Sequence, residues 1–473
     1  MNTHADEAPL MLSVSGLRGI TGKSLTEAVA GRFAAAFAAH LRERRGAPVP
    51  AIVFGRDGRA GGIPYARAAI ESLLASGCRV IDLGVAMTPT VGVVADHLRA
   101  TAGLILTASH NPAEWNGLKC LVTSPTPRGD MAHAPDAAEA AQIIARFRAT
   151  PDAPAYRERA GPESFKGAAR LHAERAIAAI GPHAVEAVRA RRFRVVVDSV
   201  NCSGAEGARA LLEALHCDLT HLGADPGGIF PHPPEPTREN LAAMSEIVTR
   251  EHCDVGFAQD PDADRLAILD ERGAYIGEEY TLVFAAMAAG AEGDAFAANL
   301  STSRMLDDVA ARLRGSVART PVGEANVVAG MLARRCSIGG EGNGGVIWPK
   351  VTLIRDSLSA MALTLALMAR ERATVSALAA STPAYVIEKR KAPIKPGLAD
   401  KASRAIAAAH QRHAVDTQDG VRVDFAATAS EGAAWLHVRA SNTEPIMRLI
   451  AEAPTAARAR HILDDAAEIL ANA

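Results

Sequence analysis

The stretch AIVFGRDGRAGGIPYARAAIESLLASGCRVIDLG (residues 51–84) decides the fold class. It begins with a short apolar run that ends in the polar loop RDGR, and it continues as an Ala- and Leu-rich segment that ends near a glycine. A second apolar run, CRVIDLG, closes the stretch. Short apolar runs are typical of buried strands, and the longer segment between them is typical of a helix. This order predicts an α/β fold with largely parallel strand pairing.

The same passage from an apolar run into a polar loop recurs along the chain. It is found in GLILTASHNP (103–112), FRVVVDSVNCSG (193–204) and CDVGFAQDPDADR (253–265). Strands also end at Asp or Asn simply because these residues stabilise turns, but the repetition suggests three related α/β domains. After residue 397 the order is helix, several strands and a closing helix, which predicts a smaller α+β domain.

Polar and proline-rich stretches mark the candidate boundaries between domains. A chain of 473 residues is too long for one core and suggests about three or four domains. TPDAPAYRERAGPES (150–164) is typical of a linker, and ASTPAYVIEKRKAPIKPG (380–397) marks the last boundary. DPGGIFPHPPEPT (225–237) has too much proline for regular structure and predicts a long interface loop.

Composition is that of an ordinary globular protein, with 48% hydrophobic and 22% charged residues. The formal net charge of −2 favours neither nucleic acid nor an anionic membrane as a partner. Apolar runs such as TLVFAAMAA (281–289) are about half a membrane span, and because the N-terminus is polar and partly acidic we expect no secretory signal there. The six cysteines include no C-x-x-C pair. We therefore expect a cytoplasmic protein with reduced thiols, and Ala-rich helices predict no particular oligomeric state.

The loop TASHNP (107–112) presents Ser109, His110 and Asn111 directly after a predicted strand. Two interpretations compete, a capped strand-to-helix turn and a loop that carries a reactive Ser109. The loop does not have the G-x-S-x-G pattern of serine hydrolases. Adjacent residues of an extended chain point to opposite sides, so a dyad of Ser109 with His110 is not expected.

DPDADR (260–265) carries three alternating carboxylates, those of Asp260, Asp262 and Asp264. On one side of an extended loop they would repel and raise one another's pKa unless a cation were present. Oxygen ligands in this number suit Mg²⁺. A calcium EF-hand fits less well because Arg265 stands where a glycine is needed, and a phosphatase with an Asp nucleophile leaves the third Asp unexplained. A solvated acidic loop remains the structural alternative.

Two further loops carry groups suited to a sugar and to a phosphate. GGEGNGGVIWP (339–349) has Glu341 as its one charged residue, and a carboxylate in such a loop suits vicinal hydroxyls. RASNTEPIMR (439–448) places Arg439 and Arg448 around small hydrogen-bonding residues, as in a phosphate clamp. A Gly-rich turn and a turn with a surface salt bridge are the structural alternatives.

Two isolated cations lie near the predicted reactive loop. SGLRG (15–19) places Arg18 beside glycines, and NGLK (116–119) ends in Lys119, ten residues after Ser109. Each suggests a contact with an anion, and each is equally consistent with a structural charge.

The order of these motifs resembles the α-D-phosphohexomutase superfamily, over nearly the whole chain. TASHNP is similar to its phosphoserine loop, DPDADR to its magnesium loop, GEGNGG to its sugar-recognition loop and RASNTEP to its phosphate-binding loop. The resemblance implies three related α/β domains with mixed sheets and a smaller C-terminal α+β domain around a central cleft. We expect these domains at residues 8–152, 153–256, 257–378 and 379–473, with the metal loop at the C-terminal boundary of the second.

The resemblance also implies a mechanism. Phospho-Ser109 gives its phosphoryl group to a hexose 6-phosphate, and the resulting 1,6-bisphosphate turns round and returns its other phosphoryl group. Arg18 and Lys119 are the implied catalytic charges beside Ser109, and a glucose 1,6-bisphosphate-type activator primes the serine. One Mg²⁺ per chain is implied at Ser109, Asp260, Asp262 and Asp264. The implied substrate-binding residues are Arg265, Glu341, Asn343, Arg439, Ser441, Asn442, Thr443 and Arg448.

The sugar loop departs from the pattern of several bacterial members, which have Ser and His where this chain has Asn343 and Gly345. A histidine acid/base is therefore not transferred to Gly345, and the group that moves the proton stays open. The loop is closer to archaeal-type members, so phosphoglucosamine mutase is the expected activity, with phosphomannomutase or phosphoglucomutase as the alternative. A metal-dependent sugar phosphatase and a non-catalytic sugar-phosphate-binding relative are more remote alternatives.

Overall fold

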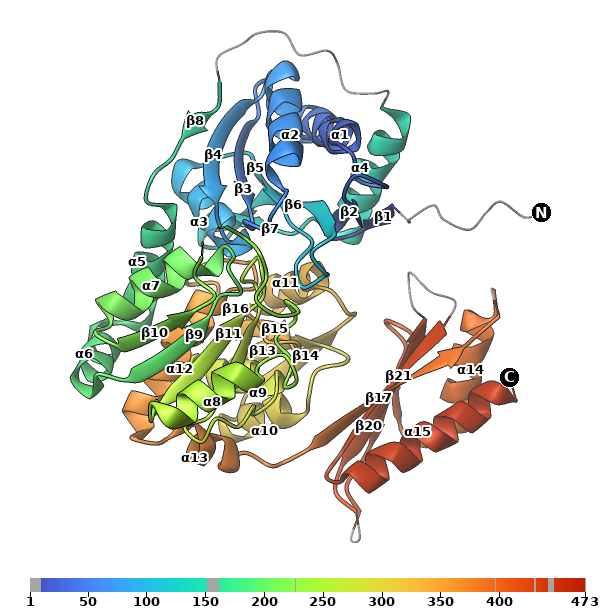
Figure 1. The fold of residues 1–473 in the computed structure, drawn as a ribbon. Coiled ribbons are helices and arrows are strands. Elements are labelled where there is room, and N and C mark those ends of the chain that lie inside the picture. Colours follow the sequence, from blue (N-terminus) through green and yellow to red (C-terminus); the bar gives the residue numbers. More distant parts are fainter. Residues whose placement is uncertain are drawn as a thin grey trace. The chain divides into compact units, whose positions relative to one another are not determined.

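The computed structural model describes residues 10–150, 161–225, 227–395, 397–428, 431–440 and 446–472 (Figure 1). The chain forms two compact units. The first contains the residues up to 290 together with 337–379, and the second contains 291–336 together with 380–473. Each unit is described by itself below.

The first unit begins with a mixed sheet of eight strands. Its strands are β1 (Met11–Ser13), β2 (Gly16–Ile20), β3 (Ala51–Arg56), β4 (Arg79–Val85), β5 (Ala102–Leu106), β6 (Trp115–Thr126), β7 (Gly129–His133) and β8 (Glu163–Ser164). The order is β1-β2-β6-β5-β3-β4-β8, with β7 paired to β6. Strand β3 is parallel to β4 and β5, as its sequence predicts, whereas β6 is antiparallel to β5 and β2.

Helices cover both faces of this sheet because its central strands are apolar on both sides (Figure 1). The helices that follow the early strands are α1 (Glu27–Arg45), α2 (Ile63–Ala75), α3 (Thr88–Leu98) and α4 (Ala137–Ala149). In β3, Ile52 and Phe54 belong to one core, with Phe33 of α1. Val53 points to the opposite face and belongs to a second core, with Val91 of α3.

A second sheet of four strands follows in the same unit. Its strands and neighbouring helices are α5 (Ala168–Ile180), α6 (Pro182–Arg191), β9 (Arg194–Asp198), α7 (Gly204–Ala214), β10 (Asp218–Leu222), α8 (Ala242–Arg250), β11 (Val255–Gln259) and β12 (Leu266–Leu269). Strands β10, β9 and β11 are parallel, and β12 is antiparallel to β11. The described residues of 225–237 form neither helix nor strand, as their proline content predicts.

The DPDADR loop 260–265 joins β11 to β12 within this one sheet. The domain boundary expected between residues 256 and 257 therefore falls inside β11. The sequence predicts the boundary there because the motif follows an apolar run. The next run, LAIL, has only four residues, and so short a run does not show whether its strand pairs in the same sheet.

The remaining elements of the first unit carry the glycine-rich loop. They are α9 (Glu279–Ala289), β15 (Ile338–Glu341), β16 (Gly345–Ile347), α12 (Ser357–Glu371) and α13 (Val375–Ala380). Strands β15 and β16 pair antiparallel, with Glu341 opposite Gly345, so GEGNGG is the turn of a hairpin. Helix α12 is almost wholly buried, and the Asp356 side chain caps its N-terminus by accepting hydrogen bonds from two backbone amides.

The second unit combines an α/β segment with an antiparallel sheet. The first segment contains β13 (Ala295–Asn299), α10 (Met305–Arg312), β14 (Ser316–Thr320) and α11 (Glu324–Arg334), and β13 is parallel to β14. The C-terminal segment contains β17 (Val386–Pro393), α14 (Ala399–Ala409), β18 (Ala414–Asp416), β19 (Val421–Phe425), β20 (Ala434–Ala440), β21 (Ile446–Ala453) and α15 (Ala456–Ala471). Its five strands form one sheet in the order β17-β21-β20-β19-β18.

Hydrogen bonds join the two segments of the second unit. The Arg422 guanidinium donates to the Leu300 carbonyl, and Ser301 Oγ lies 2.8 Å from His437 Nδ1. The buried Glu452 carboxylate accepts a bond of 3.0 Å from Arg304 N. Residues of the C-terminal sheet are therefore held by partners that precede them by more than a hundred positions.

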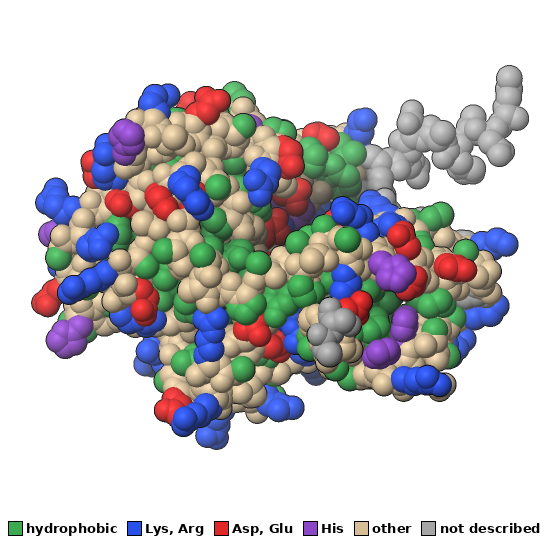
Figure 2. All heavy atoms as spheres, turned by 90° about the horizontal axis from the view of Figure 1, so that it is seen from below, with side chains coloured by type: hydrophobic (Ala, Val, Ile, Leu, Met, Phe, Trp, Pro, Cys, Tyr) green, Lys and Arg blue, Asp and Glu red, His purple; other side chains and the backbone are tan. Residues whose placement is uncertain are grey.

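Charged side chains of both signs are interspersed over the face shown in Figure 2, in keeping with the net charge of −2. Among the described residues, no helix has both the length and the apolar character that crossing a membrane requires. All six cysteines are free thiols, and burial raises the pKa of each of them, Cys78, Cys120, Cys202, Cys217, Cys253 and Cys336.

Asp96 of α3 is a buried carboxylate outside the predicted site. Its side chain is 3% exposed, Oδ1 accepts a hydrogen bond of 2.6 Å from Ala132 N, and Oδ2 lies 3.5 Å from Arg175 Nη1. Burial raises the pKa of Asp96 to about 7. The folded state thus keeps a proton that the unfolded chain loses near its usual pKa of 3.8, so stability falls as the pH rises from about 4 to about 7.

We expect Asp96→Asn to raise the free energy of unfolding at pH 8 by on the order of 2 kcal/mol, because the amide keeps the acceptor and carries no charge. Differential scanning calorimetry at pH 8 and at pH 4 measures the effect. The gain should be present at pH 8 and absent at pH 4. Glu213→Gln, which changes an exposed carboxylate of α7, is the control, and an equal gain from Asp96→Asn at both pH values would contradict the assignment.

Candidate active site

Ser109 lies three residues beyond β5 in a strained turn. Its φ of 51° is in the left-handed region, which costs a residue other than glycine about 1 kcal/mol or more. The residue is 1% exposed, and its hydroxyl donates a hydrogen bond of 2.7 Å to Asp260 Oδ2. Such strain in a buried polar residue is typical of functional sites.

His110 lies on the same side as Ser109, with Nδ1 at 3.4 Å from the serine Oγ. The expectation that the two side chains point apart is wrong, because the chain turns at Ser109 and is not extended there. Burial, together with Arg265 and Arg18, lowers the pKa of His110 to about 3. The imidazole is therefore neutral near pH 7, and the long contact is a weak hydrogen bond at most.

Three buried residues hold the serine turn in place. Thr107 Oγ1 accepts a bond of 2.8 Å from Ser109 N, and Arg59 Nη2 donates one of 2.6 Å to Ser109 O. Asp57 Oδ2 accepts bonds from both, at 2.9 Å from Arg59 Nε and 2.8 Å from Thr107 Oγ1. Because Asp57 and Arg59 directly follow β3, the neighbouring strand fixes the backbone on both sides of the serine hydroxyl.

The three carboxylates of DPDADR converge beside Ser109. Asp260, Asp262 and Asp264 are 0% exposed, and each offers an oxygen atom within 4.8 Å of the others. Asp262 Oδ1 and Asp264 Oδ1 are buried and make no hydrogen bond. A buried carboxylate oxygen without a partner is costly, and an all-oxygen donor set suits a hard divalent cation. The residues therefore fit a magnesium site at which the serine hydroxyl is also present.

The other oxygens of these carboxylates are held by donors. Lys119 Nζ lies 2.7 Å from Asp262 Oδ2 and 2.9 Å from Asp264 Oδ2. Burial, followed by the charges of Asp262 and Asp264, raises the pKa of Asp260 well above its usual range. In Asp262 the effect of burial is outweighed by the Lys119 ammonium, which lowers the pKa. Arg355 and Lys119 lower the pKa of Asp264 in the same way, so the cluster has one carboxyl that resists ionisation and two that stay ionised.

Arg18 and Arg265 lie at the same loops. Arg18 Nη1 donates a bond of 2.7 Å to Asn111 Oδ1. Arg265 N donates a bond of 3.1 Å to Asp260 Oδ1, and Arg265 Nε lies 3.9 Å from Asp264 Oδ1. The first unit therefore brings these two arginines together with Lys119, Ser109 and the three aspartates.

The GEGNGG hairpin contacts the DPDADR loop through one arginine. Arg355 Nη1 donates a bond of 2.7 Å to Glu341 Oε2, and Nη2 donates one of 2.6 Å to Asp264 Oδ2. Asn343 Oδ1 turns back to accept a bond of 3.3 Å from Gly345 N. Glu341 and Asn343 thus lie in a loop that is tied to the carboxylate cluster.

Arg439 and Arg448 belong to the second unit, where they are direct partners on the antiparallel strands β20 and β21. Arg439 Nε lies 3.1 Å from an Asp419 oxygen, and Arg448 is exposed. The predicted residues Ser441, Asn442 and Thr443 lie outside the described residues.

Sequence reasoning missed four residues that hold this site. Asp57 and Arg59 lie in the RDGR loop, which follows a strand as DPDADR does, and that likeness was the available signal. Thr88 donates a bond of 2.6 Å to Asp262 Oδ2, and no motif marks it. Arg355 lies outside every quoted motif, so only the structure identifies it.

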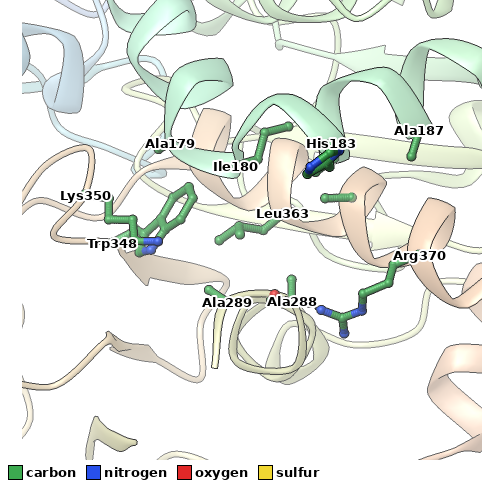
Figure 3. Close-up of a pocket in the computed structure, with 12 residues that line it drawn as sticks. Ala179, Ile180, His183, Ala187, Ala288, Ala289, Trp348, Lys350, Leu363 and Arg370 are labelled. Carbon is green, nitrogen blue, oxygen red and sulfur yellow. Dashed lines mark hydrogen bonds between the residues drawn. The ribbon is translucent and has the colours of Figure 1, made fainter. Parts of the chain in front are cut away.

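A separate cavity of about 410 Å³ lies between α5, α6, α9 and α12 (Figure 3). Trp348 and Lys350 lie together in it, with the ammonium 5.6 Å from the indole ring centre. Arg370 donates to the carbonyls of Met287 and Ala288 at the end of α9. The walls are mostly alanine and other apolar residues, without a carboxylate to hold sugar hydroxyls. None of the predicted site residues lines this cavity.

Models of the phosphoglucomutase/phosphomannomutase family match almost the whole chain. The alpha/beta/alpha domains I, II and III match residues 11–144, 175–273 and 277–385, and the C-terminal domain matches residues 386–469. The chain belongs to this family. As the resemblance implied, this phosphohexomutase has three α/β domains followed by a C-terminal domain, and it is an intramolecular phosphotransferase.

Named relatives agree with this membership. The phosphohexomutase is 34% identical to the "Phosphoglucomutase/phosphomannomutase" of Thermococcus kodakarensis, over 97% of this chain and 98% of the relative. It is 33% identical to the "Probable phosphoglucosamine mutase" of Methanopyrus kandleri, over 96% of each chain. The crystal structure of a phosphoglucomutase/phosphomannomutase family protein from Burkholderia thailandensis superposes with a TM-score of 0.80, at 27% identity over 97% of this chain and 98% of the other.

Proposed function

We propose that this phosphohexomutase interconverts hexose 6-phosphates and hexose 1-phosphates through a phosphorylated Ser109, with glucosamine phosphate as its main substrate. The observation that supports this most is the hydrogen bond of 2.7 Å from the buried Ser109 hydroxyl to Asp260, within a cluster of three carboxylates. A probable phosphoglucosamine mutase and a phosphoglucomutase/phosphomannomutase are among the named relatives, so the mannose and glucose phosphates are the alternative substrates.

In the proposed reaction, the bond between Ser109 Oγ and phosphorus breaks as a hydroxyl oxygen of the sugar bonds to the same phosphorus. The Oγ freed from phosphorus stays on Ser109, takes up the proton that the sugar hydroxyl loses, and donates its hydrogen bond to Asp260. The same transfer in reverse restores the phosphoserine after the bisphosphate has turned. The Thr107 and Arg59 contacts keep the serine backbone in one conformation through both transfers. Positioned groups of this kind lower the barrier because they need no reorganisation.

Asp260, Asp262, Asp264 and the phosphoserine would hold one Mg²⁺ per chain. When bound, such an ion neutralises negative charge on the phosphoryl oxygens. Lys119 and Arg18 supply fixed positive charge on the same phosphoryl group. Arg18 and Lys119 are therefore the proposed catalytic residues beside Ser109, and Arg265 is placed to contact phosphate or sugar.

Sugar hydroxyls would bind to Glu341, with Asn343 beside it. The phosphate that does not react would bind in the second unit, where guanidinium groups and small hydroxyls suit an anion. Its proposed ligands are Arg439, Ser441, Asn442, Thr443 and Arg448. A glucose 1,6-bisphosphate-type activator, a cytoplasmic location and the boundaries near residues 152 and 378 remain predictions.

Phosphorus NMR tests the proposal directly. The protein with Mg²⁺ and a trace of glucose 1,6-bisphosphate is offered glucosamine, mannose and glucose 6-phosphates in separate samples. We expect the 6-phosphate signal to convert to a 1-phosphate signal, fastest with glucosamine, and excess chelator to stop the conversion. Release of inorganic phosphate alone would identify a phosphatase, and no change with any sugar would identify a binding protein.

A further inference from the structure

A space in the sugar-recognition hairpin is filled by a side chain from outside it. Gly345 begins β16, and a Cβ atom placed there would lie 2.3 Å from Arg355 Cδ and 3.0 Å from Arg355 Cγ. Carbon atoms that are not bonded do not approach so closely, so any side chain at position 345 would displace Arg355. The glycine and the arginine therefore form one arrangement.

Arg355 uses this space to reach two buried carboxylates of different loops. One guanidinium nitrogen binds Glu341 Oε2 at 2.7 Å and the other binds Asp264 Oδ2 at 2.6 Å, and the residue is 8% exposed. Hydrogen bonds between charged groups in a buried setting are short and directional, as these are. The planar guanidinium fixes the angle between its two partners, which a lysine in the same place would not do.

The bond to Asp264 decides which of its oxygens remains available. Asp264 Oδ2 is occupied by Arg355 and Lys119, while Oδ1 is buried and makes no hydrogen bond. Asp262 has the same arrangement, with Oδ2 bound to Lys119 and Oδ1 without a hydrogen bond. Arg355 thus turns one oxygen of Asp264 toward the position where the carboxylates converge.

We propose that Arg355 is a positioning residue that couples the sugar-recognition loop to the metal loop. It holds Glu341 for the sugar hydroxyls and orients Asp264 for the cation, so the occupancy of each site favours the other. Because arginine keeps its proton at every working pH, its part is orientation and not proton transfer. The identity of the sugar ligand rests on the proposed function, whereas the bridge between the two loops does not.

Metal affinity without any sugar gives the first test. Mn²⁺ binding is followed by electron paramagnetic resonance in the full-length protein and in Arg355→Met and Arg355→Lys. Residues that orient a metal ligand change metal affinity by about 10–100-fold when they are replaced, so we expect Arg355→Met to weaken Mn²⁺ binding about tenfold. Arg355→Lys should recover only part of it. Arg370→Met, which removes an arginine of α12 bound to the carbonyls of α9, should leave Mn²⁺ affinity unchanged.

The coupling itself gives the second test. The dissociation constant of glucosamine 6-phosphate is measured by calorimetry with and without Mg²⁺, in the wild type and in Arg355→Met. We expect Mg²⁺ to tighten sugar-phosphate binding in the wild type and to have about a tenfold smaller effect in the variant. In steady-state assays the KM should rise more than kcat falls, because binding is lost first, whereas a variant that merely folds poorly would lower kcat alone.

Gly345→Ala leaves Arg355 in the chain and tests whether misfolding alone explains the weaker binding in the Arg355 variants. Gly345→Ala should displace the Arg355 side chain and weaken Mn²⁺ and sugar phosphate in the same way. The double variant with Arg355→Ala should then be no weaker than Arg355→Ala alone, because the clash has gone. Unchanged Mn²⁺ affinity in Arg355→Met, or additive losses in the double variant, would overturn the proposal. If the wild type turned over no hexose phosphate, the mutase proposal would fail while Mn²⁺ affinity still decided the role of Arg355.

Discussion

Ser109→Ala is expected to lower the rate of hexose-phosphate isomerisation by about 10⁴-fold or more, because the hydroxyl that would carry the phosphoryl group is removed. Turnover is measured by phosphorus NMR. Intact-protein mass spectrometry after incubation with glucose 1,6-bisphosphate should show one added phosphoryl group on the wild type and none on the variant. Ser164→Ala, at an exposed serine of β8, is the matched control and should keep both activities. A Ser109→Ala protein with full activity would refute the central assignment.

A second replacement at the same position separates chemistry from folding. Ser109 has a φ of 51°, which glycine adopts without strain and alanine does not. We expect Ser109→Gly to be as inactive as Ser109→Ala but more stable than it, by about 1 kcal/mol in the free energy of unfolding. A glycine variant less stable than the alanine variant would show that the turn is not strained.

Asp260→Asn is expected to abolish the stabilisation of the protein by Mg²⁺ and to lower turnover by at least about 10³-fold. At a concentration of about 100 times its Kd, a bound ion adds roughly 2.7 kcal/mol to the free energy of unfolding. The asparagine variant loses a charged ligand, so its melting temperature should not respond to Mg²⁺. Asp218→Asn, at an exposed residue of β10, should respond as the wild type does.

In the presence of chelator, the Asp260→Asn variant should be more stable than the wild type. Burial and the charges of Asp262 and Asp264 raise the pKa of Asp260. The folded state is therefore destabilised as the pH rises above the usual pKa of a carboxyl group. Asparagine carries no charge and avoids that cost, so Asp260→Asn should melt above the wild type in chelator at pH 8. Calorimetry with and without Mg²⁺ measures both effects. An equal response of the two proteins to Mg²⁺ would place the cation elsewhere.

Local sequence predicted the elements and motifs of the site well. The two apolar runs of residues 51–84 form β3 and β4, and the Ala- and Leu-rich segment between them forms α2. In each case the spacing of the apolar residues matches the face or faces that the element buries. The carboxylates of DPDADR converge as their alternation suggested. In both cases the information lies within about a dozen neighbouring residues, which is the range over which periodicity and turn chemistry act.

Contacts between distant segments could not be predicted in this way. Arg355 reaches Asp264 across 91 positions, and Arg59 reaches the Ser109 carbonyl across 50. These pairs depend on which strands become neighbours, and no local pattern encodes that choice. The turn at Ser109 was missed for a related reason, because contacts with Asp57, Arg59 and Thr107 impose a conformation that serine does not prefer by itself.

The division of the second unit between two chain segments limits how such proteins can be recombined. A gene fusion that exchanged only residues 380–473 between relatives would pair a foreign sheet with a native 291–336 segment. The Glu452 carboxylate, for example, accepts bonds from both Trp435 Nε1 and Arg304 N, and these donors would then come from different parents. Functional chimeras should therefore carry both segments from one parent. In evolution, substitutions in the two segments are expected to be inherited as matched sets.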